Sequence, residues 1–404
     1  MNTGTDNRQM SVYNERKPVL IDNKTTFRQM MSVLEGRRRF AVDTESDSLF
    51  SYYPKVCLLQ ITVPATSDED GAPPDAMNVV DFLVDTLRYP ALDPLGRLLA
   101  RPEAEVIMHA AENDLLLLQR EFGFSIANVF DTQLAARILG WQQAGLAAIL
   151  EKCFGVVSDK RMQRTNWSKR PLTPEQIAYA QMDTHYLFAL QRKLATELKD
   201  AGRWEEAQEA FTLLVQTDYG EKEPPERSFW QMKETRSVPR EYTGVLEALW
   251  EWREGEAQRR NVPPFKVLRN HVLAQLAEVQ PATEDELGQM PGLSRGDVQR
   301  YGPQLLRAIA EGRKRPLPDL PEPTLRPEQM LDREVLNRYD ALRKWRTRTA
   351  EARNVAPEIV LANSALLEIA KRRPRTQAEL LEFREVGPWK AKTYGPAILQ
   401  IVAK

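Results

Sequence analysis

The chain has 404 residues, 42% of them hydrophobic, and its formal net charge is −1. This length and hydrophobic content exclude a disordered chain and suggest two to four domains with buried cores, and the balanced charge confines any nucleic-acid binding to local basic patches. Two cysteines and three histidines exclude a disulfide framework and disfavour a histidine-rich metal site, so carboxylates are the better candidates for catalysis.

The N-terminal half of the chain alternates between strand-like and helix-like patterns. Residues 1–17 are polar and lack the apolar core of a signal peptide, and no stretch of the chain is apolar enough to span a bilayer. Runs of β-branched and apolar residues predict strands at residues 39–42, 55–63, 77–82 and 105–108. Apolar residues at helical spacing predict helices at residues 27–34, 92–100, 113–122, 132–139, 146–154 and 174–198. This alternation predicts an α/β domain with a mixed sheet at residues 1–220, whose first three strands form an antiparallel meander.

The C-terminal half is helical and repeats itself. Residues 222–240 are polar and contain prolines, which predicts a connector, and residues 313–327 form a second, proline-rich linker. Trp252-Arg253 recurs 93 residues later as Trp345-Arg346, and other pairs recur at the same offset. Two copies of one small all-α domain are therefore predicted at residues 221–313 and 328–404, with residues 314–327 between them.

Three short acidic motifs stand out in the α/β domain. Asp43 and Glu45 belong to a strand end, where alternation places them on the same side of the sheet. Asp114 lies just inside a predicted helix, and Tyr179 and Asp183 are four residues apart on one helical face. Taken singly, the motifs also fit a solvated strand end, an acid in the first turn of a helix and a surface pair.

Together the four carboxylates suit a two-metal phosphodiesterase. Mg²⁺ and Mn²⁺ prefer carboxylate and water oxygens as ligands. Two such ions can activate a water and stabilise the leaving oxygen, and they offset the repulsion between the carboxylates and a phosphodiester. A tyrosine beside one ion can orient the attacking water or help to deprotonate it.

The set of motifs resembles the DEDD exonuclease superfamily, in the variant whose last motif is Tyr-x-x-x-Asp. Residues 43–61, 109–140 and 159–183 are similar to the ribonuclease D family, and the tandem repeats resemble HRDC domains. The resemblance implies an RNase H-like exonuclease domain followed by two HRDC domains, with two divalent ions, Mg²⁺ or Mn²⁺. It also implies that Asp43, Glu45, Asp114 and Asp183 are the metal ligands and that Tyr179 positions the water.

The resemblance further implies a 3′–5′ exoribonuclease that releases nucleoside 5′-monophosphates. Its expected substrates and partners are tRNA precursors and other small structured RNAs. A DNA 3′–5′ exonuclease of the proofreading kind is one alternative, since only contacts to the 2′-OH separate the two. A non-catalytic RNA-binding protein is the other, and the complete ligand set argues against it. We expect a cytoplasmic monomer with no membrane partner.

Two basic segments are candidates for RNA binding. The first precedes the last acidic motif and combines basic residues with an aromatic one, namely Lys160, Arg161, Arg164, Trp167 and Arg170. The second lies in the last repeat and contains Arg343, Lys344, Arg346, Lys371 and Arg372. A solvated loop around one buried tryptophan, and a solvated basic helix, are the alternative interpretations. The acidic insertion at residues 64–76 is predicted to be a solvated loop.

Overall fold

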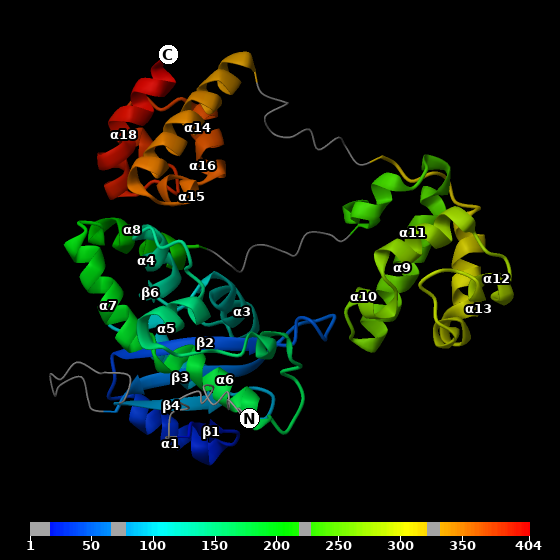
Figure 1. The fold of residues 1–404 in the computed structure, drawn as a ribbon, viewed down its shortest axis with the longest axis horizontal. Coiled ribbons are helices and arrows are strands. Elements are labelled where there is room, and N and C mark those ends of the chain that lie inside the picture. The colour runs from blue at the N-terminus through cyan, green and yellow to red at the C-terminus, as the bar shows by residue number, and fades with distance from the viewer. Residues whose placement is uncertain (1–16, 66–77, 218–227, 321–331) are drawn as a thin grey trace, which may run out of the picture. The chain divides into compact units, whose positions relative to one another are not determined.

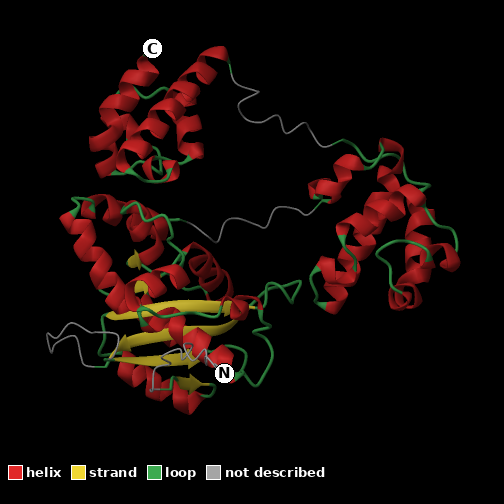
Figure 2. Ribbon diagram, in the orientation of Figure 1, coloured by secondary structure: helices red, strands yellow, loops and turns green. Residues whose placement is uncertain are grey.

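The computed structural model describes residues 17–65, 78–217, 228–320 and 332–404. These residues form two compact units. The first unit contains residues 17–46, 56–65, 78–217 and 332–404, and the second contains residues 47–55 and 228–320. Within the described residues, strands occur only in the first unit (Figure 2), in agreement with the predicted order of an α/β domain followed by helical domains.

A mixed six-stranded sheet with the order β1-β4-β3-β2-β5-β6 forms the centre of the first unit (Figure 1). Its strands are β1 (Val19–Ile21), β2 (Arg39–Ser46), β3 (Val56–Pro64), β4 (Val79–Val84), β5 (Glu105–Met108) and β6 (Val129–Asp131). The predicted antiparallel meander is confirmed as β2, β3 and β4, whereas β1, β5 and β6 join by parallel pairing. β1 and β6 were not predicted, because three residues are too few to show a period.

Helices cover both faces of this sheet. They are α1 (Lys24–Leu34), α2 (Asp93–Leu99), α3 (Glu112–Phe122), α4 (Thr132–Ile138), α5 (Leu146–Phe154), α6 (Pro174–His185), α7 (Leu187–Asp200) and α8 (Trp204–Val215). Val42 packs in one core with α1, α2 and α3, while its neighbour Ala41 packs in another with α4, α7 and α8, since successive strand side chains point to opposite faces. The predicted helix at 174–198 is two helices, because α6 ends at His185 and α7 packs on other elements.

The two repeats have the same order of helices. The first contains α9 (Thr243–Arg260), α10 (Pro264–Val267), α11 (Asn270–Val279), α12 (Glu284–Gly288) and α13 (Arg295–Gly312). The second contains α14 (Arg333–Arg353), α15 (Pro357–Val360), α16 (Asn363–Arg372), α17 (Gln377–Leu380) and α18 (Pro388–Ala403). The first long helix of each repeat ends at a left-handed asparagine, Asn261 or Asn354, at the predicted offset of 93 residues.

The predicted connector at 222–240 differs from a simple spacer where the structure describes it. The connector at 222–240 contains three 3₁₀ turns, Phe229–Gln231, Lys233–Ser237 and Arg240–Tyr242, and buries Phe229 and Met232 in the core of the first repeat. The segment was predicted to be a connector because most of its residues are polar, and the few apolar residues that it buries were not recognised. Most of the insertion at 64–76, and residues 321–327 of the second linker, lie outside the described residues.

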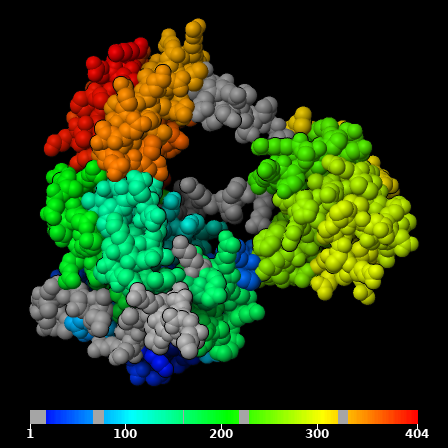
Figure 3. All heavy atoms as spheres, viewed as in Figure 1, coloured from blue at the N-terminus to red at the C-terminus, as the bar shows by residue number. Residues whose placement is uncertain are grey.

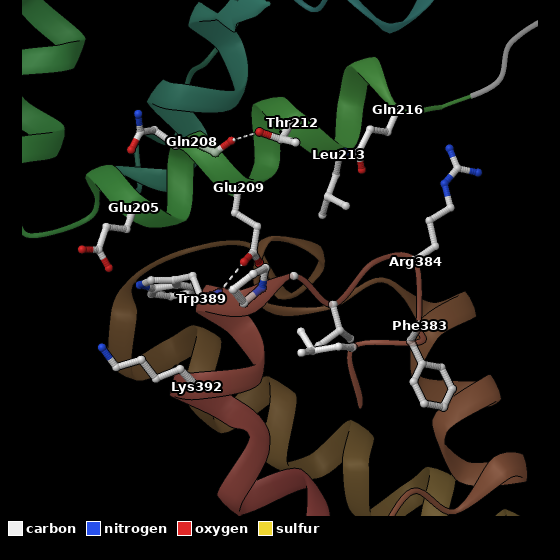
Figure 4. A pocket seen from close by; sticks show the side chains of 14 residues that line it. Glu205, Gln208, Glu209, Thr212, Leu213, Gln216, Phe383, Arg384, Trp389 and Lys392 are labelled. Atoms are coloured by element: carbon white, nitrogen blue, oxygen red, sulfur yellow. Dashed lines mark hydrogen bonds between the residues drawn. The ribbon is translucent and has the colours of Figure 1, made fainter. Parts of the chain in front are cut away.

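The second repeat packs against the α/β domain within the first unit (Figure 3). Ile359 of α15 joins the core that α4, α7 and α8 cover. Arg353 forms an ion pair with Glu206 of α8, whose side chain is 1% exposed. The carboxylate of Glu209, also on α8, accepts the backbone N–H groups at the start of α18, beside a pocket of about 930 Å³ (Figure 4). This repeat is therefore attached by polar and apolar contacts.

None of the described helices is both long enough and apolar enough to cross a membrane.

Candidate active site

Asp43 and Glu45 project from the central strand of the sheet. β2 lies between β3 and β5, and its residues Phe40 to Val42 are fully buried. From Asp43 onwards the side chains are partly exposed, because the strand emerges from the core at this end. Asp43 and Glu45 are alternate residues and therefore lie on one side of the strand.

α6 supplies Asp183 and Tyr179. The helix begins with a capping box, in which the Thr173 side chain and the Gln176 side chain each bond the backbone of the other residue. Tyr179 and Asp183 share one face of the helix, are each 8% exposed, and are joined by a hydrogen bond between their side chains. Because Thr173 fixes where α6 begins, it also fixes the positions of Tyr179 and Asp183 along the helix.

A buried polar network anchors the same helix to the sheet. The carboxylate of Asp81 on β4 accepts hydrogen bonds from His185 Nδ1 (2.8 Å), Gln181 Nε2 (2.7 Å) and Thr62 Oγ1 (2.7 Å). The Thr62 hydroxyl also lies 2.7 Å from that of Thr184. These contacts involve residues on both sides of Asp183, so they hold its segment of α6 against β3 and β4. Asp81 was not among the predicted site residues, because nothing in the sequence distinguishes it from other aspartates in strands.

The structure brings the predicted carboxylates together. Ligand oxygens of Asp43, Glu45 and Asp183 all lie within 4.8 Å of one another, although these residues are up to 140 positions apart in the chain. Asp114, near the start of α3, accepts a hydrogen bond from the Thr44 hydroxyl. Because Thr44 stands between Asp43 and Glu45, this bond ties the fourth carboxylate to the same strand end.

Asp131 shapes the turn that leads into α3. Its carboxylate accepts N–H groups from Ala110 (3.1 Å) and Ala111 (2.9 Å), and it also caps α4 through the N–H groups of Gln133 and Leu134. Ala110 has a φ of 59°, a left-handed conformation that is unfavourable for alanine. The bonds to Asp131 offset this cost and fix the start of the helix that carries Asp114. Asp131 therefore both caps α4 and holds the turn before α3.

His109, in the same turn, has a structural role. Its Nδ1 lies 2.9 Å from the hydroxyl of Thr132, and burial lowers the pKa of the ring to about 4. The ring is therefore neutral near pH 7 and contributes no charge to the site.

Burial and mutual repulsion raise the pKa values of the clustered carboxyl groups. The pKa of Glu45 is raised to about 9, by burial first and then by the charges of Asp183 and Asp114. Burial is also the largest cause of the raised pKa values of Asp43 and Asp183, and it raises the pKa of Asp114 to about 6 against hydrogen bonds that lower it. Negative charge is therefore costly in this cluster unless a cation is present, which is the electrostatic signature of a metal site.

The basic segment before α6 is only partly available to a ligand. Trp167 is 0% exposed, so its ring cannot stack on a base. Arg170 is held by the carboxylate of Asp85 (2.6 Å and 2.8 Å) and by the carbonyl oxygen of Cys57. The predicted stacking of Trp167 on a base is therefore wrong, and the guanidinium of Arg170, 15% exposed, is already bonded to protein acceptors.

The rest of this segment remains open to solvent. Arg161 pairs with Asp159 in an exposed position, and Arg164 is exposed. The side chain of Lys160 is outside the described part of the structure. Gln163, which the sequence analysis did not name, is exposed and forms a hydrogen bond with Tyr179.

In the second repeat, Arg346 is a structural residue. It is 9% exposed and donates from Nη1 to the carbonyl oxygen of Leu361 at 2.9 Å, and Arg253 makes the same bond to Leu268 in the first repeat. Its predicted contact with RNA is therefore wrong, and its recurrence in the repeat reflects packing.

The other basic residues predicted in this repeat are exposed. Lys371 and Arg372 pair with nearby glutamates, and Arg343 lies 4.0 Å from the carboxylate of Asp340. Lys344 lies beside Arg343 on the exposed side of α14.

Two family models match the chain. A 3′–5′ exonuclease model matches residues 18–199, and an HRDC domain model matches residues 243–309 and 335–402. Among solved structures, a protein from Bifidobacterium adolescentis is similar at 23% identity and a TM-score of 0.77, over 98% of this chain and 99% of that one. Escherichia coli RNase D is similar at 23% identity and a TM-score of 0.63, over 96% and 99% of the two chains. These structures establish the shared fold.

Two curated relatives have a higher sequence identity to this chain than these two structures do. Ribonuclease D of Gluconacetobacter diazotrophicus is 32% identical over 95% of this chain and 92% of its own length. Ribonuclease D of Granulibacter bethesdensis is 30% identical over the same shares of the two chains. With the acidic cluster in the exonuclease domain, these similarities over nearly the full length show that the chain belongs to the ribonuclease D family of metal-dependent 3′–5′ exoribonucleases.

Proposed function

We propose that this chain trims the 3′ ends of tRNA precursors and other small structured RNAs by a two-metal-ion mechanism, releasing nucleoside 5′-monophosphates. The observation that carries the mechanism is the convergence of Asp43, Glu45 and Asp183 within 4.8 Å, with Asp114 tied to the same strand through Thr44. The choice of substrate is supported by the RNase D of Escherichia coli, which is described as an exoribonuclease involved in structured RNA processing.

The residues present fit Mg²⁺ or Mn²⁺. All four donors are carboxylates, the ligands that these ions prefer, and Oδ2 of Asp183 is buried without a hydrogen-bond partner among the described residues. When bound, two such ions supply an activated water and stabilise the leaving oxygen of the phosphodiester. Asp43, Glu45, Asp114 and Asp183 would hold the pair.

Tyr179 acts on the attacking water in this proposal. Burial, with the nearby charges of Asp183 and Glu45, raises the pKa of its hydroxyl, which therefore stays protonated near neutral pH. A protonated phenol donates a hydrogen bond, so Tyr179 orients the water and does not remove its proton. In this structure the hydroxyl is hydrogen-bonded to Asp183, and its hydrogen becomes available to the water once that carboxylate acts as a metal ligand.

The RNA itself would be held by basic side chains that remain exposed. In the exonuclease domain these are Arg161 and Arg164, and in the second repeat they include Arg343, Lys344, Lys371 and Arg372. Contacts of this kind with phosphates depend on salt and not on base sequence. A cytoplasmic location and a monomeric state remain predictions.

The proposal is tested by incubating the chain with 5′-labelled and 3′-labelled RNA, with matched DNA, in Mg²⁺, Mn²⁺ or excess chelator. We expect progressive shortening of 5′-labelled RNA, labelled mononucleotide from 3′-labelled RNA, and no reaction in chelator. Robust hydrolysis in chelator would contradict the metal mechanism. Equal rates on DNA would contradict the preference for RNA and favour the DNA exonuclease alternative. A tRNA precursor with a 3′ extension should be shortened to a defined end.

A further inference from the structure

Gln60 is a polar residue in the middle of the sheet that lacks partners. It lies on β3, and its side chain is 0% exposed. Neither its Oε1 nor its Nε2 has a hydrogen-bond partner among the described residues. A buried amide that loses its bonds to water and gains none in return is costly, and a leucine or methionine would fill the same space without that cost. We therefore expect the Gln60 amide to form hydrogen bonds when the protein binds its ligands.

The position of Gln60 points to the acidic cluster. In the antiparallel register of β2 and β3, Gln60 lies directly opposite Asp43, and residues so opposed have side chains on the same face. Thr62, two residues further on the same face, contacts Thr184 of α6 at 2.7 Å. α6 packs against β3 (Figure 1). Gln60 therefore lies on the face of β3 that α6 covers, next to Asp43 and near the segment that carries Asp183.

We propose that Gln60 is a positioning residue for the metal ligands. Its amide group has two N–H donors, and they bond the carboxylates of Asp43 and Asp183 when these turn toward bound ions. The inference rests on the proposed metal mechanism.

A glutamine suits this role better than a charged donor. A lysine or arginine at position 60 would neutralise the carboxylates and compete with the ions for them. The neutral amide orients the same oxygens and leaves their negative charge for the metal. Groups that hydrogen-bond to metal ligands in this way contribute about 10–100-fold to metal affinity in other proteins.

The test is Gln60→Met, which keeps nearly the same volume and removes both polar atoms. We expect the melting temperature of the metal-free protein to stay the same or rise, because the unsatisfied amide is gone. We expect the affinity for Mn²⁺, measured by calorimetric titration of the full chain, to fall about tenfold or more. A residue that only fills space would leave the Mn²⁺ affinity unchanged.

Gln191→Met is the matched control. Gln191 is a buried glutamine of the same domain, 8% exposed, but its Oε1 accepts a hydrogen bond from Arg39 at 2.8 Å. Its replacement should lower the melting temperature and leave the Mn²⁺ affinity unchanged, the opposite of the pattern for Gln60.

The outcomes separate this inference from the proposed function. If the unaltered chain binds no Mn²⁺, the proposed function fails. If it binds Mn²⁺ and Gln60→Met binds equally well, only the inference fails. Should Gln60→Met not fold, Gln60→Asn keeps an amide that is one methylene too short, and an unchanged Mn²⁺ affinity in that variant would overturn the inference as well.

Discussion

At Asp183, a buried carboxyl group lies beside other carboxyl groups, so its charge is stabilised only when a cation is present. The raised pKa values, about 9 at Glu45, mean that the metal-free folded chain binds more protons than the unfolded chain. The folded chain binds the extra proton at pH values between about 4.3, the ordinary pKa of glutamate, and the raised pKa of Glu45. Through this window the free energy of unfolding falls as pH rises. The clustered carboxyl groups therefore lower the stability of the metal-free fold as the pH rises.

We therefore expect Asp183→Asn to abolish turnover and to stabilise the metal-free protein. The amide removes one negative charge from the cluster, so the melting temperature in chelator at pH 8 should rise by about 2–4 °C for each ~1 kcal/mol of relieved repulsion. Its decline between pH 5 and pH 9 should also be shallower. Glu112→Gln, at an exposed acid of α3, is the control and should change neither. A variant with a near-normal rate would show that Asp183 is not a ligand.

Tyr179→Phe removes the hydroxyl group and keeps the buried ring. A positioned group that assists proton transfer or orients water contributes about 10²–10⁴-fold, and we expect the low end because the ions still activate the water. Single-turnover rates should fall about 100-fold, with RNA affinity retained. Tyr186→Phe, just after α6, should leave the rate unchanged. Equal single-turnover rates for Tyr179→Phe and the unaltered chain would exclude the role in catalysis.

At the scale of elements, the site depends on where α3 and α6 begin and end. α6 is fixed by its capping box and by Asp81, and the turn before α3 is fixed by Asp131. These contacts lie next to the proposed metal ligands and are not themselves among them. Their function is to make the helix positions reproducible, since a shift of about 1 Å in a catalytic group can cost 100-fold in rate.

Asp131→Asn should destabilise the domain more than an ordinary cap substitution. The carboxylate accepts four N–H groups, and an amide offers one oxygen and places N–H groups against Ala111. We expect a loss of about 2–3 kcal/mol in urea unfolding, together with weaker Mn²⁺ binding. Asp159→Asn, at the cap of a 3₁₀ turn, should cost much less. Equal losses in the two variants would contradict the role of Asp131 in the turn.

At the scale of the whole molecule, the two repeats differ in how their last helix begins. Ser294 and Asp297 form a capping box for α13 within the first repeat. α18 has Gly387 at the corresponding place and no cap of its own, and Glu209 of the exonuclease domain accepts its N–H groups instead. The space beside Gly387 is filled by the carboxyl group of Glu209, so a side chain at position 387 would displace that carboxyl group. The second repeat is thus specialised for attachment to the exonuclease domain.

Glu206→Gln and Glu209→Gln should loosen this attachment. The first leaves Arg353 without its charged partner, and the second weakens the cap on α18. Loss of one partner from a buried ion pair costs up to about 3–5 kcal/mol, and we expect less here because Arg353 is 19% exposed. Amide hydrogen exchange at Trp389 and Lys390 should quicken in both variants, whereas the exposed Glu205→Gln should match the unaltered chain. Unchanged exchange in both variants would show that these contacts do not hold the repeat.

The amino-acid sequence by itself determined the class of fold and the tandem repeat, and it singled out the acidic residues that we propose as the site. It could do so because apolar periodicity, a constant offset of 93 residues and the motif Tyr-x-x-x-Asp are all local in the chain. The spacing of Tyr179 and Asp183, for example, requires only that α6 be a helix.

Only the tertiary structure decided which basic and aromatic residues face solvent. Trp167, Arg170 and Arg346 have the composition of a nucleic-acid interface, yet each is held by core contacts, because burial depends on neighbours from distant strands and helices. The same is true of Asp81, Asp131 and Gln60. Nothing in the sequence distinguishes these three residues from others of their kind. Asp81 and Asp131 are recognised by their hydrogen bonds to distant residues, and Gln60 by its lack of them beside the clustered carboxylates.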